Sequence, residues 1–145
     1  MDYGACQEAL RNAQLERPRP TDVHAKTWMT WRLLALRGRW PELFAGGSYR
    51  PVHIEGDGAS QLFAFERKGE DARCITIVIL RPAAMTDSDG RILPEVFTDA
   101  RIDLGGEQWS DWLGDGTALS GRTAVRDLLG NYPAAVLVSE NLDGR

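Results

Sequence analysis

The stretch that decides the fold runs from Lys26 to Val52 and reads KTWMTWRLLALRGRWPELFAGGSYRPV. Its first half carries apolar residues at helical spacing, which predicts an amphipathic helix. Gly46 and Gly47 are expected to end the helical part, because glycine is the residue most often found just beyond a helix C-terminus. From Ser48 onward the apolar period changes to two, which is typical of a β-strand. The stretch therefore joins a helical segment to a β structure.

The predicted helix has recognisable ends. Thr21 or Asp22 is expected as its N-cap, since a short polar side chain there accepts a hydrogen bond from the first free amides. Gly38 is expected near its C-terminus, and Pro41 is expected to begin one further helical turn. The apolar surface is wider than one stripe, which predicts cover on more than one side. The residues that form it are Val23, Trp28, Trp31, Leu33, Leu34, Ala35 and Leu36.

A shorter helix is predicted over residues 3–15, where alanines occupy most of the apolar positions. Its thin apolar face offers little surface to bury, and short helices depend on such burial. Pro18 and Pro20 are expected to end it, because each lacks an amide donor and restricts the residue before it.

The rest of the chain consists of short runs with period two, separated by turns rich in Gly and Asp. Residues 73–80 are almost continuously apolar, which predicts a central strand buried on both faces. Residues 114–121 are predicted to be a loop. The pattern predicts a mainly β protein: an N-terminal α-helical segment over residues 1–46, then an antiparallel β-sandwich of about seven strands over residues 47–145. The other predicted strands cover residues 48–54, 61–67, 97–104, 108–113 and 134–139.

The composition is that of a globular protein without general affinity for nucleic acid. The 145 residues carry a net charge of −4, whereas phosphate binding requires clustered positive charge. The apolar runs are strand-sized, well short of the roughly 18 residues that span a bilayer, so no membrane contact is expected. The N-terminal residues lack the apolar segment of a secretory signal. Cys6 and Cys74 lie far apart, which suits a reducing compartment, and a cytoplasmic location is expected.

No set of residues has the spacing of a metal or cofactor site. His24 and His53 belong to no pair of the kind that binds zinc. Residues 87–90, Asp-Ser-Asp-Gly, begin like a calcium loop but lack its closing glutamate. Cys74 lies in the buried-strand pattern, which predicts an inert core thiol. Two acid pairs are of the type found in glycosidases, but they lie in turn-rich segments, where carboxylates usually cap turns. These pairs are Glu95 with Asp99, and Asp111 with Asp115.

Three tryptophans, Trp40, Trp109 and Trp112, are the candidate carbohydrate-binding residues, because an exposed indole stacks on the C–H face of a sugar ring. Alternation along a strand places Trp109 and Trp112 on opposite faces. One of them is therefore expected to pack inward, while the other is exposed or covers a neighbouring layer. Trp28 and Trp31 are expected to pack in a core or against another domain.

Several short motifs follow one another in a definite order along the chain. They begin with Lys26 and Trp28 and continue through Arg-Leu-Leu-Ala-Leu-Arg at residues 32–37. Further members are Pro41, Leu43 and Phe44, then Gly47, Tyr49 and Pro51, and the segments 63–67, 97–99, 109–114 and 128–138. In this order and spacing they resemble the C-terminal end of maltooligosyl trehalose synthases, members of the alpha-amylase superfamily. The resemblance covers about residues 21–139, with one departure, since no threonine follows Asp99.

The resemblance implies a place in trehalose biosynthesis. Enzymes of that family are isomerases, named (1→4)-α-D-glucan 1-α-D-glucosylmutase, that turn the reducing-end α-1,4 linkage of a maltodextrin into an α,α-1,1 linkage. Their catalytic carboxylates lie at the C-terminal ends of barrel strands and act by a retaining scheme. The resemblance maps residues 1–46 to the end of that barrel and residues 47–145 to an amylase-type C-terminal domain. It assigns no catalytic residue to this chain, which is expected to be inactive alone.

Two roles remain open at this point. The first is structural: the helix and one sandwich face pack against the catalytic barrel of the same enzyme, which is missing from this chain. The second is binding: a β-sandwich module holds maltodextrin on exposed tryptophans. The wide apolar surface of the helix favours the structural role, while no motif supports an independent hydrolase.

Overall fold

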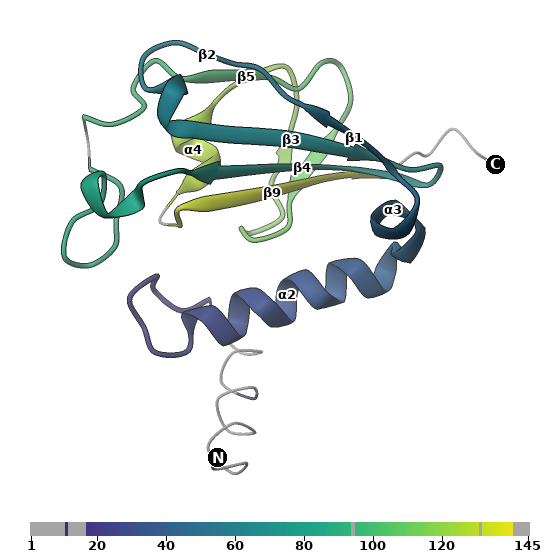
Figure 1. The fold of residues 1–145 in the computed structure, drawn as a ribbon, viewed down its shortest axis with the longest axis horizontal. Helices are drawn as coiled ribbons and strands as arrows, with labels where there is room; N and C mark the ends of the chain where they lie inside the picture. Colours follow the sequence, from purple (N-terminus) through teal and green to yellow (C-terminus); the bar gives the residue numbers. More distant parts are fainter. Residues whose placement is uncertain (1–10, 12–16, 94, 131, 141–145) are drawn as a thin grey trace.

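The structure, a computed structural model, describes residues 11, 17–93, 95–130 and 132–140. The helix predicted over residues 3–15 lies outside the described residues except for Arg11. Within the described part, nine strands form two antiparallel sheets, accompanied by a few helices. The predicted mainly β fold is therefore confirmed, and Figure 1 shows helix α2 lying along one side of the β structure.

The main sheet has six strands in the order β1-β3-β4-β9-β6-β7, all antiparallel to their neighbours. Consecutive strands β3 and β4 form a hairpin, and β9 returns from the end of the chain to pair with β4. The strands are β1 (Ser48–Pro51), β3 (Leu62–Lys68), β4 (Ala72–Ile79), β6 (Trp109–Asp111), β7 (Ala118–Leu119) and β9 (Ala134–Glu140).

The second sheet is smaller, with three short strands in the order β2-β5-β8. It lies across one face of the main sheet together with a short helix, α4. Its elements are β2 (Ile54–Glu55), β5 (Arg101–Asp103), β8 (Arg122–Ala124) and α4 (Val125–Leu129); two 3-10 turns, η1 (Ala59–Gln61) and η2 (Pro82–Ala84), complete the connections.

Two hydrophobic cores lie on the two faces of the main sheet. In β9, Ala135 and Leu137 enter the core shared with the small sheet and α4, whereas Val136 and Val138 enter the core shared with α2. Strand β4 divides its side chains in the same way. The prediction that residues 73–80 form a strand buried on both faces is thus confirmed, because one face carries a second sheet and the other a helix.

Helix α2 spans Ala25–Arg39, and α3 spans Pro41–Ala45. Trp28 and Leu36 of α2 are buried against the main sheet, while Leu34 on the opposite side is 61% exposed. The expected helix and the turn beginning at Pro41 are confirmed. No helix in the described part of the chain is long and apolar enough to cross a membrane.

The predicted ends of this helix are wrong. His24 is the N-cap residue, and Asp22 instead accepts a hydrogen bond from the backbone N–H of Arg19 at 2.8 Å, within a turn before the helix. Gly38 lies inside the helix, where a methyl group in place of its hydrogen would meet no atom within 4 Å. At that exposed position glycine weakens a helix without breaking it.

Two strand predictions and one loop prediction also need correction. The run 48–54 is divided, because β1 ends at Pro51 and Ile54 pairs with Ile102 in the other sheet. In the run 97–104 only Arg101–Asp103 is a strand, since buried Phe97 has a left-handed backbone with φ 58° and packs against Gly58. The loop predicted for residues 114–121 contains β7, while β8 and α4 were not predicted at all.

Helix α2 is fastened to the main sheet by a reciprocal pair of hydrogen bonds. The indole Nε1–H of Trp112 donates to the backbone oxygen of Arg32 at 2.8 Å. In return, the guanidinium of Arg32 donates through Nε and Nη2 to the backbone oxygen of Trp112. The same guanidinium lies 4.9 Å from the centre of the Trp112 ring, a distance suited to a cation–π contact. Residues on both sides of position 46 therefore share one core, and the predicted domain boundary there stays a prediction.

A chain of ion pairs crosses one end of the main sheet. The Glu66 carboxylate is fully buried and accepts hydrogen bonds from Arg50 of β1 and Arg73 of β4. Arg73 also reaches Glu107, and it covers the ring of buried Trp109 at 5.2 Å. Burial alone raises the pKa of Glu66, but the bonds and charges of the two arginines outweigh it and hold that pKa below its usual range.

Gly47 is expected to tolerate no side chain at the start of β1. A Cβ there would lie 2.3 Å from the backbone oxygen of Leu43, whereas at Gly46 the nearest atom, the oxygen of Glu42, is 3.8 Å away. We expect Gly47→Ala to lower the free energy of unfolding by about 1–3 kcal/mol. The matched Gly46→Ala should change it by less than about 1 kcal/mol. Urea unfolding measures both, and equal midpoints would contradict this reading.

The ion pairs of Glu66 are expected to make the protein acid-sensitive. A carboxylate with a lowered folded-state pKa stabilises the fold above its unfolded pKa, about 4.3, and this contribution is lost as pH falls further through the folded value. Glu66→Gln should remove that slope, and should lower stability at pH 7 by about 3 kcal/mol because Arg73 loses its buried partner. Glu107→Gln, which changes the half-exposed partner of Arg73, should cost less than about 1 kcal/mol. The free energy of unfolding, measured from pH 7 to pH 3 for each variant, tests this. If it fell with pH as steeply in Glu66→Gln as in the unmodified chain, Glu66 would not be the source of the acid sensitivity.

Candidate functional site

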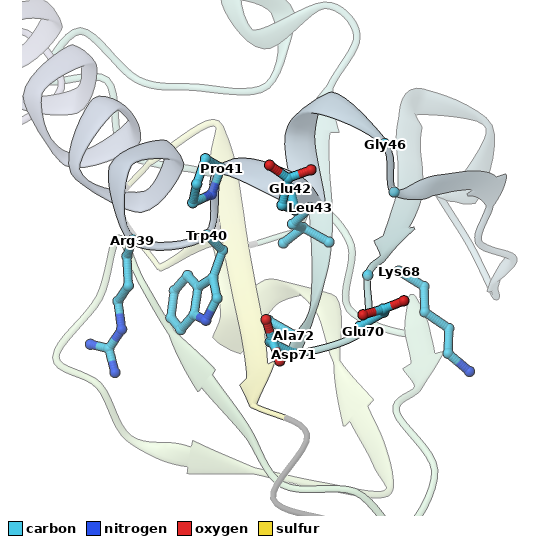
Figure 2. A pocket seen from close by; sticks show the side chains of 12 residues that line it. Arg39, Trp40, Pro41, Glu42, Leu43, Gly46, Lys68, Glu70, Asp71 and Ala72 are labelled. Atoms are coloured by element: carbon cyan, nitrogen blue, oxygen red, sulfur yellow. The ribbon is translucent and has the colours of Figure 1, made fainter. Parts of the chain in front are cut away.

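A cavity of about 520 Å³ lies where the junction of α2 and α3 meets the hairpin between β3 and β4. Trp40, the linking residue between the two helices, lines it from one side. Lys68 and Asp71 line it from the hairpin. The floor is apolar, because Leu43 and Ala72 are both buried there. Figure 2 shows these side chains around the opening.

The cavity exists because the chain turns sharply on each side of it. Trp40 has a non-helical backbone, with φ −130° and ψ 67°, that interrupts the helix, and its N–H still donates to the oxygen of Leu36 at 3.2 Å. Pro41 then begins α3, as its fixed φ favours at a first helical position. On the other side, the N–H of Gly69 donates to the oxygen of Ala72 at 2.9 Å and closes the hairpin.

Both signs of charge border the cavity. Glu42, Glu70 and Asp71 supply carboxylates, whereas Arg39 and Lys68 supply cations. Arg39 is already engaged, since its Nη2 donates to Glu140 at 2.6 Å. Among the residues that the structure describes, no hydrogen bond or ion pair engages the side chains of Glu42, Lys68 or Asp71.

Trp40 is half-buried and held between aromatic and cationic neighbours. Its ring centre lies 5.8 Å from that of Trp112 in an edge-on arrangement. The guanidinium of Arg39 lies 4.5 Å from its ring centre. In Figure 2, Arg39 stands on one side of the indole and Asp71 on the other. The structure thus brings two of the three candidate tryptophans, Trp40 and Trp112, together at one end of α2.

Trp109 lies apart from these two. It is 2% exposed in the core between the sheets, and its Nε1–H donates to the backbone oxygen of Leu104 at 3.1 Å. Trp112 faces the opposite side and packs with α2. The alternation predicted for the two residues is confirmed. Neither face of the Trp109 ring is open to a sugar, because the core covers both. The indole N–H of Trp112 is already bonded to the backbone oxygen of Arg32.

Three further residues weighed in the sequence, Cys74, Asp111 and Asp87, take structural positions. Burial raises the pKa of Cys74 to about 11, in agreement with an inert thiol. Burial likewise raises the pKa of Asp111, whose carboxylate accepts a hydrogen bond from the N–H of Leu113 at 3.0 Å. Asp87 closes a turn by accepting from the N–H groups of Asp89 and Arg91, both at 2.9 Å. In the part of the chain described, no group of three or more His, Cys, Asp or Glu could hold a metal ion.

The sequence alone gave no reason to connect Trp40 with the hairpin residues. Residues 68–71 read as a polar turn in the sequence, and in the structure Lys68 ends β3 while residues 69–71 form the turn; about thirty positions separate them from Trp40. Only the pairing of β1 with β3, which starts at Ser48 and Lys68, returns the hairpin to the end of α3. Glu42, Lys68 and Asp71 were therefore missed, and no local signal marks them as a group.

Comparison with known proteins gives one consistent answer. No family model matches the chain. Curated proteins from two strains of Mycobacterium tuberculosis, named as maltooligosyl trehalose synthases, are 32% identical over 144 residues, which are 97% of this chain. The structure of maltooligosyltrehalose synthase from Arthrobacter ramosus, and that of a single-residue variant, match at a TM-score of 0.73 and 32% identity over 96% of this chain.

These matches cover only part of the relatives. The chain spans 16% of the length of the curated proteins and 17% of the chains in the solved structures. The resemblance seen in the motifs is confirmed in sequence and in three dimensions. The chain matches a C-terminal part of maltooligosyl trehalose synthase.

Proposed function

We propose that this chain serves as the non-catalytic C-terminal domain of a maltooligosyl trehalose synthase-like enzyme. The observation that carries the proposal is the extent of the match: almost all of this chain aligns with about a sixth of each relative. In this proposal the catalytic carboxylates belong to the remaining part of the enzyme, a barrel. The reaction is the isomerisation of maltodextrin to maltooligosyl trehalose, in the cytoplasm, as a step of trehalose biosynthesis.

The proposed role is to support the catalytic barrel through the outer side of α2. The inner side of that helix already packs on the main sheet through Trp28 and Leu36. The outer side still exposes Leu33 and Leu34, and Val23 is exposed in the turn just before the helix. Burying such side chains against a partner stabilises the contact by about 25 cal/mol per Å². The contact would give the barrel a rigid neighbour, because α2 is itself anchored by Arg32 and Trp112.

The first test is a replacement in the Arthrobacter ramosus enzyme. This chain is put in place of the matching region, and the chimera is assayed for trehalose-forming activity on maltopentaose beside the unmodified enzyme. We expect the chimera to be active and the isolated chain to give no product. Turnover by the isolated chain, or a folded chimera without activity, would contradict the proposal.

A matched pair of variants locates the contact. Leu33→Ser with Leu34→Ser should leave the unfolding midpoint of the isolated chain nearly unchanged, because both side chains are exposed. In the chimera the same double change should lower the thermal midpoint. Thr30→Ser, also on the exposed surface of α2, is the control.

A second candidate function is the binding of maltodextrin. The observation in its favour is the position of Trp40, a tryptophan proposed for sugar stacking, beside a cavity with polar groups at its border. This function is compatible with the structural role, since the cavity and the exposed leucines of α2 involve different residues.

A further inference from the structure

The cavity between Trp40 and the β3–β4 hairpin combines an aromatic side with three charged side chains, Glu42, Lys68 and Asp71, that no hydrogen bond or ion pair engages among the described residues. We propose that it is a binding site for a neutral oligosaccharide, with one sugar ring stacked on Trp40 and its hydroxyls bonded to Asp71, Glu42 and Lys68. This inference rests on the second candidate function and names its site.

Trp40 lines the cavity with a half-buried side chain. Arg39 covers the ring at 4.5 Å, and Figure 2 shows Arg39 on the side away from Asp71. The guanidinium is itself fixed by Glu140. The ring is thus in contact with a cation and with the ring of Trp112, which restricts its movement. Stacking on an immobilised aromatic ring loses little side-chain freedom on binding.

The polar groups at the border favour an uncharged ligand rich in hydroxyls. A carboxylate only accepts hydrogen bonds and an ammonium only donates them, whereas a sugar hydroxyl does both. Glu42 and Asp71 would thus accept from hydroxyls and Lys68 would donate to one. The nearby charges are of both signs, which gives no clear advantage to an anion or a cation. The carboxylates also do not converge as a metal site does, within the residues described.

The site is formed in advance of any ligand. Its apolar floor, Leu43 and Ala72, belongs to the core beneath the main sheet. Gly69 lies so close to Leu43 that a Cβ there would touch its Cα and Cδ1 at 3.4 Å. The volume of about 520 Å³ lies within the range typical of small-molecule pockets. A cavity that is already shaped and partly apolar needs no rearrangement to accept a sugar ring.

Calorimetric titration of the 145-residue chain with maltoheptaose tests the proposal. We expect a dissociation constant on the order of 1 mM, as for other weak ligands. Asp71→Ala should weaken binding about tenfold, the usual effect of losing a hydrogen bond to a charged group. The control is Asp57→Ala, an exposed carboxylate in the turn after β2 that does not line the cavity. Both variants should unfold at the same urea concentration as the unmodified chain.

Each result of the titration tests the sugar site in the cavity and does not test the proposed packing of α2 against a barrel. Tenfold weaker binding by Asp71→Ala alone supports the cavity. No heat up to about 10 mM sugar overturns the proposal. Equal binding by both variants overturns the location, and binding of tetramethylammonium in place of maltoheptaose overturns the ligand class. Activity of the Arthrobacter ramosus chimera depends on none of these outcomes, so a failed titration and a failed structural role are told apart.

Discussion

The exchange of hydrogen bonds between Arg32 and Trp112 is the constraint on which the arrangement of layers depends. Each residue donates from its side chain to the backbone oxygen of the other, so neither can move without breaking the contact of its partner. Both bonds are partly buried, and the lower dielectric there strengthens them. With α2 fixed in this way, Trp40 at its end and α3 beyond it take fixed positions beside the β3–β4 hairpin. The cavity is a consequence of that placement.

The main sheet explains why a chain of this size needs the helix. Strands β4 and β9 carry apolar side chains on both faces, so a single covering layer would leave half of them in water. The small sheet and α4 cover one face, and α2 with α3 covers the other. Helices α2 and α3 thus share a core with the main sheet, whatever role residues 1–46 have in a longer enzyme.

The sequence was sufficient for features that depend on local pattern. Helix α2, strands β3, β4 and β9, and the opposite facing of Trp109 and Trp112 follow from periodicity, and the turn at Pro41 follows from the preference of proline for a first helical position. Features that depend on distant partners could not be predicted. The sequences of strand β8 and helix α4 carry no periodic apolar pattern. Phe97 has a left-handed backbone, and the burial of its ring offsets the cost of that conformation. The cavity was missed for the same reason, because its two sides meet only after β1 pairs with β3.

The two outer strands of the main sheet have a further effect on how copies of this protein behave at high concentration. Strand β1 has four residues, all exposed, and ends at Pro51, which offers no N–H group. Strand β7 at the opposite edge has only two residues. Long, flat edges with free backbone groups recruit strands from other molecules and begin aggregation. Here the proline in β1 and the shortness of β7 leave few free backbone N–H and C=O groups at either edge. Both edges of the main sheet therefore resist the addition of strands from other molecules and the growth of fibres.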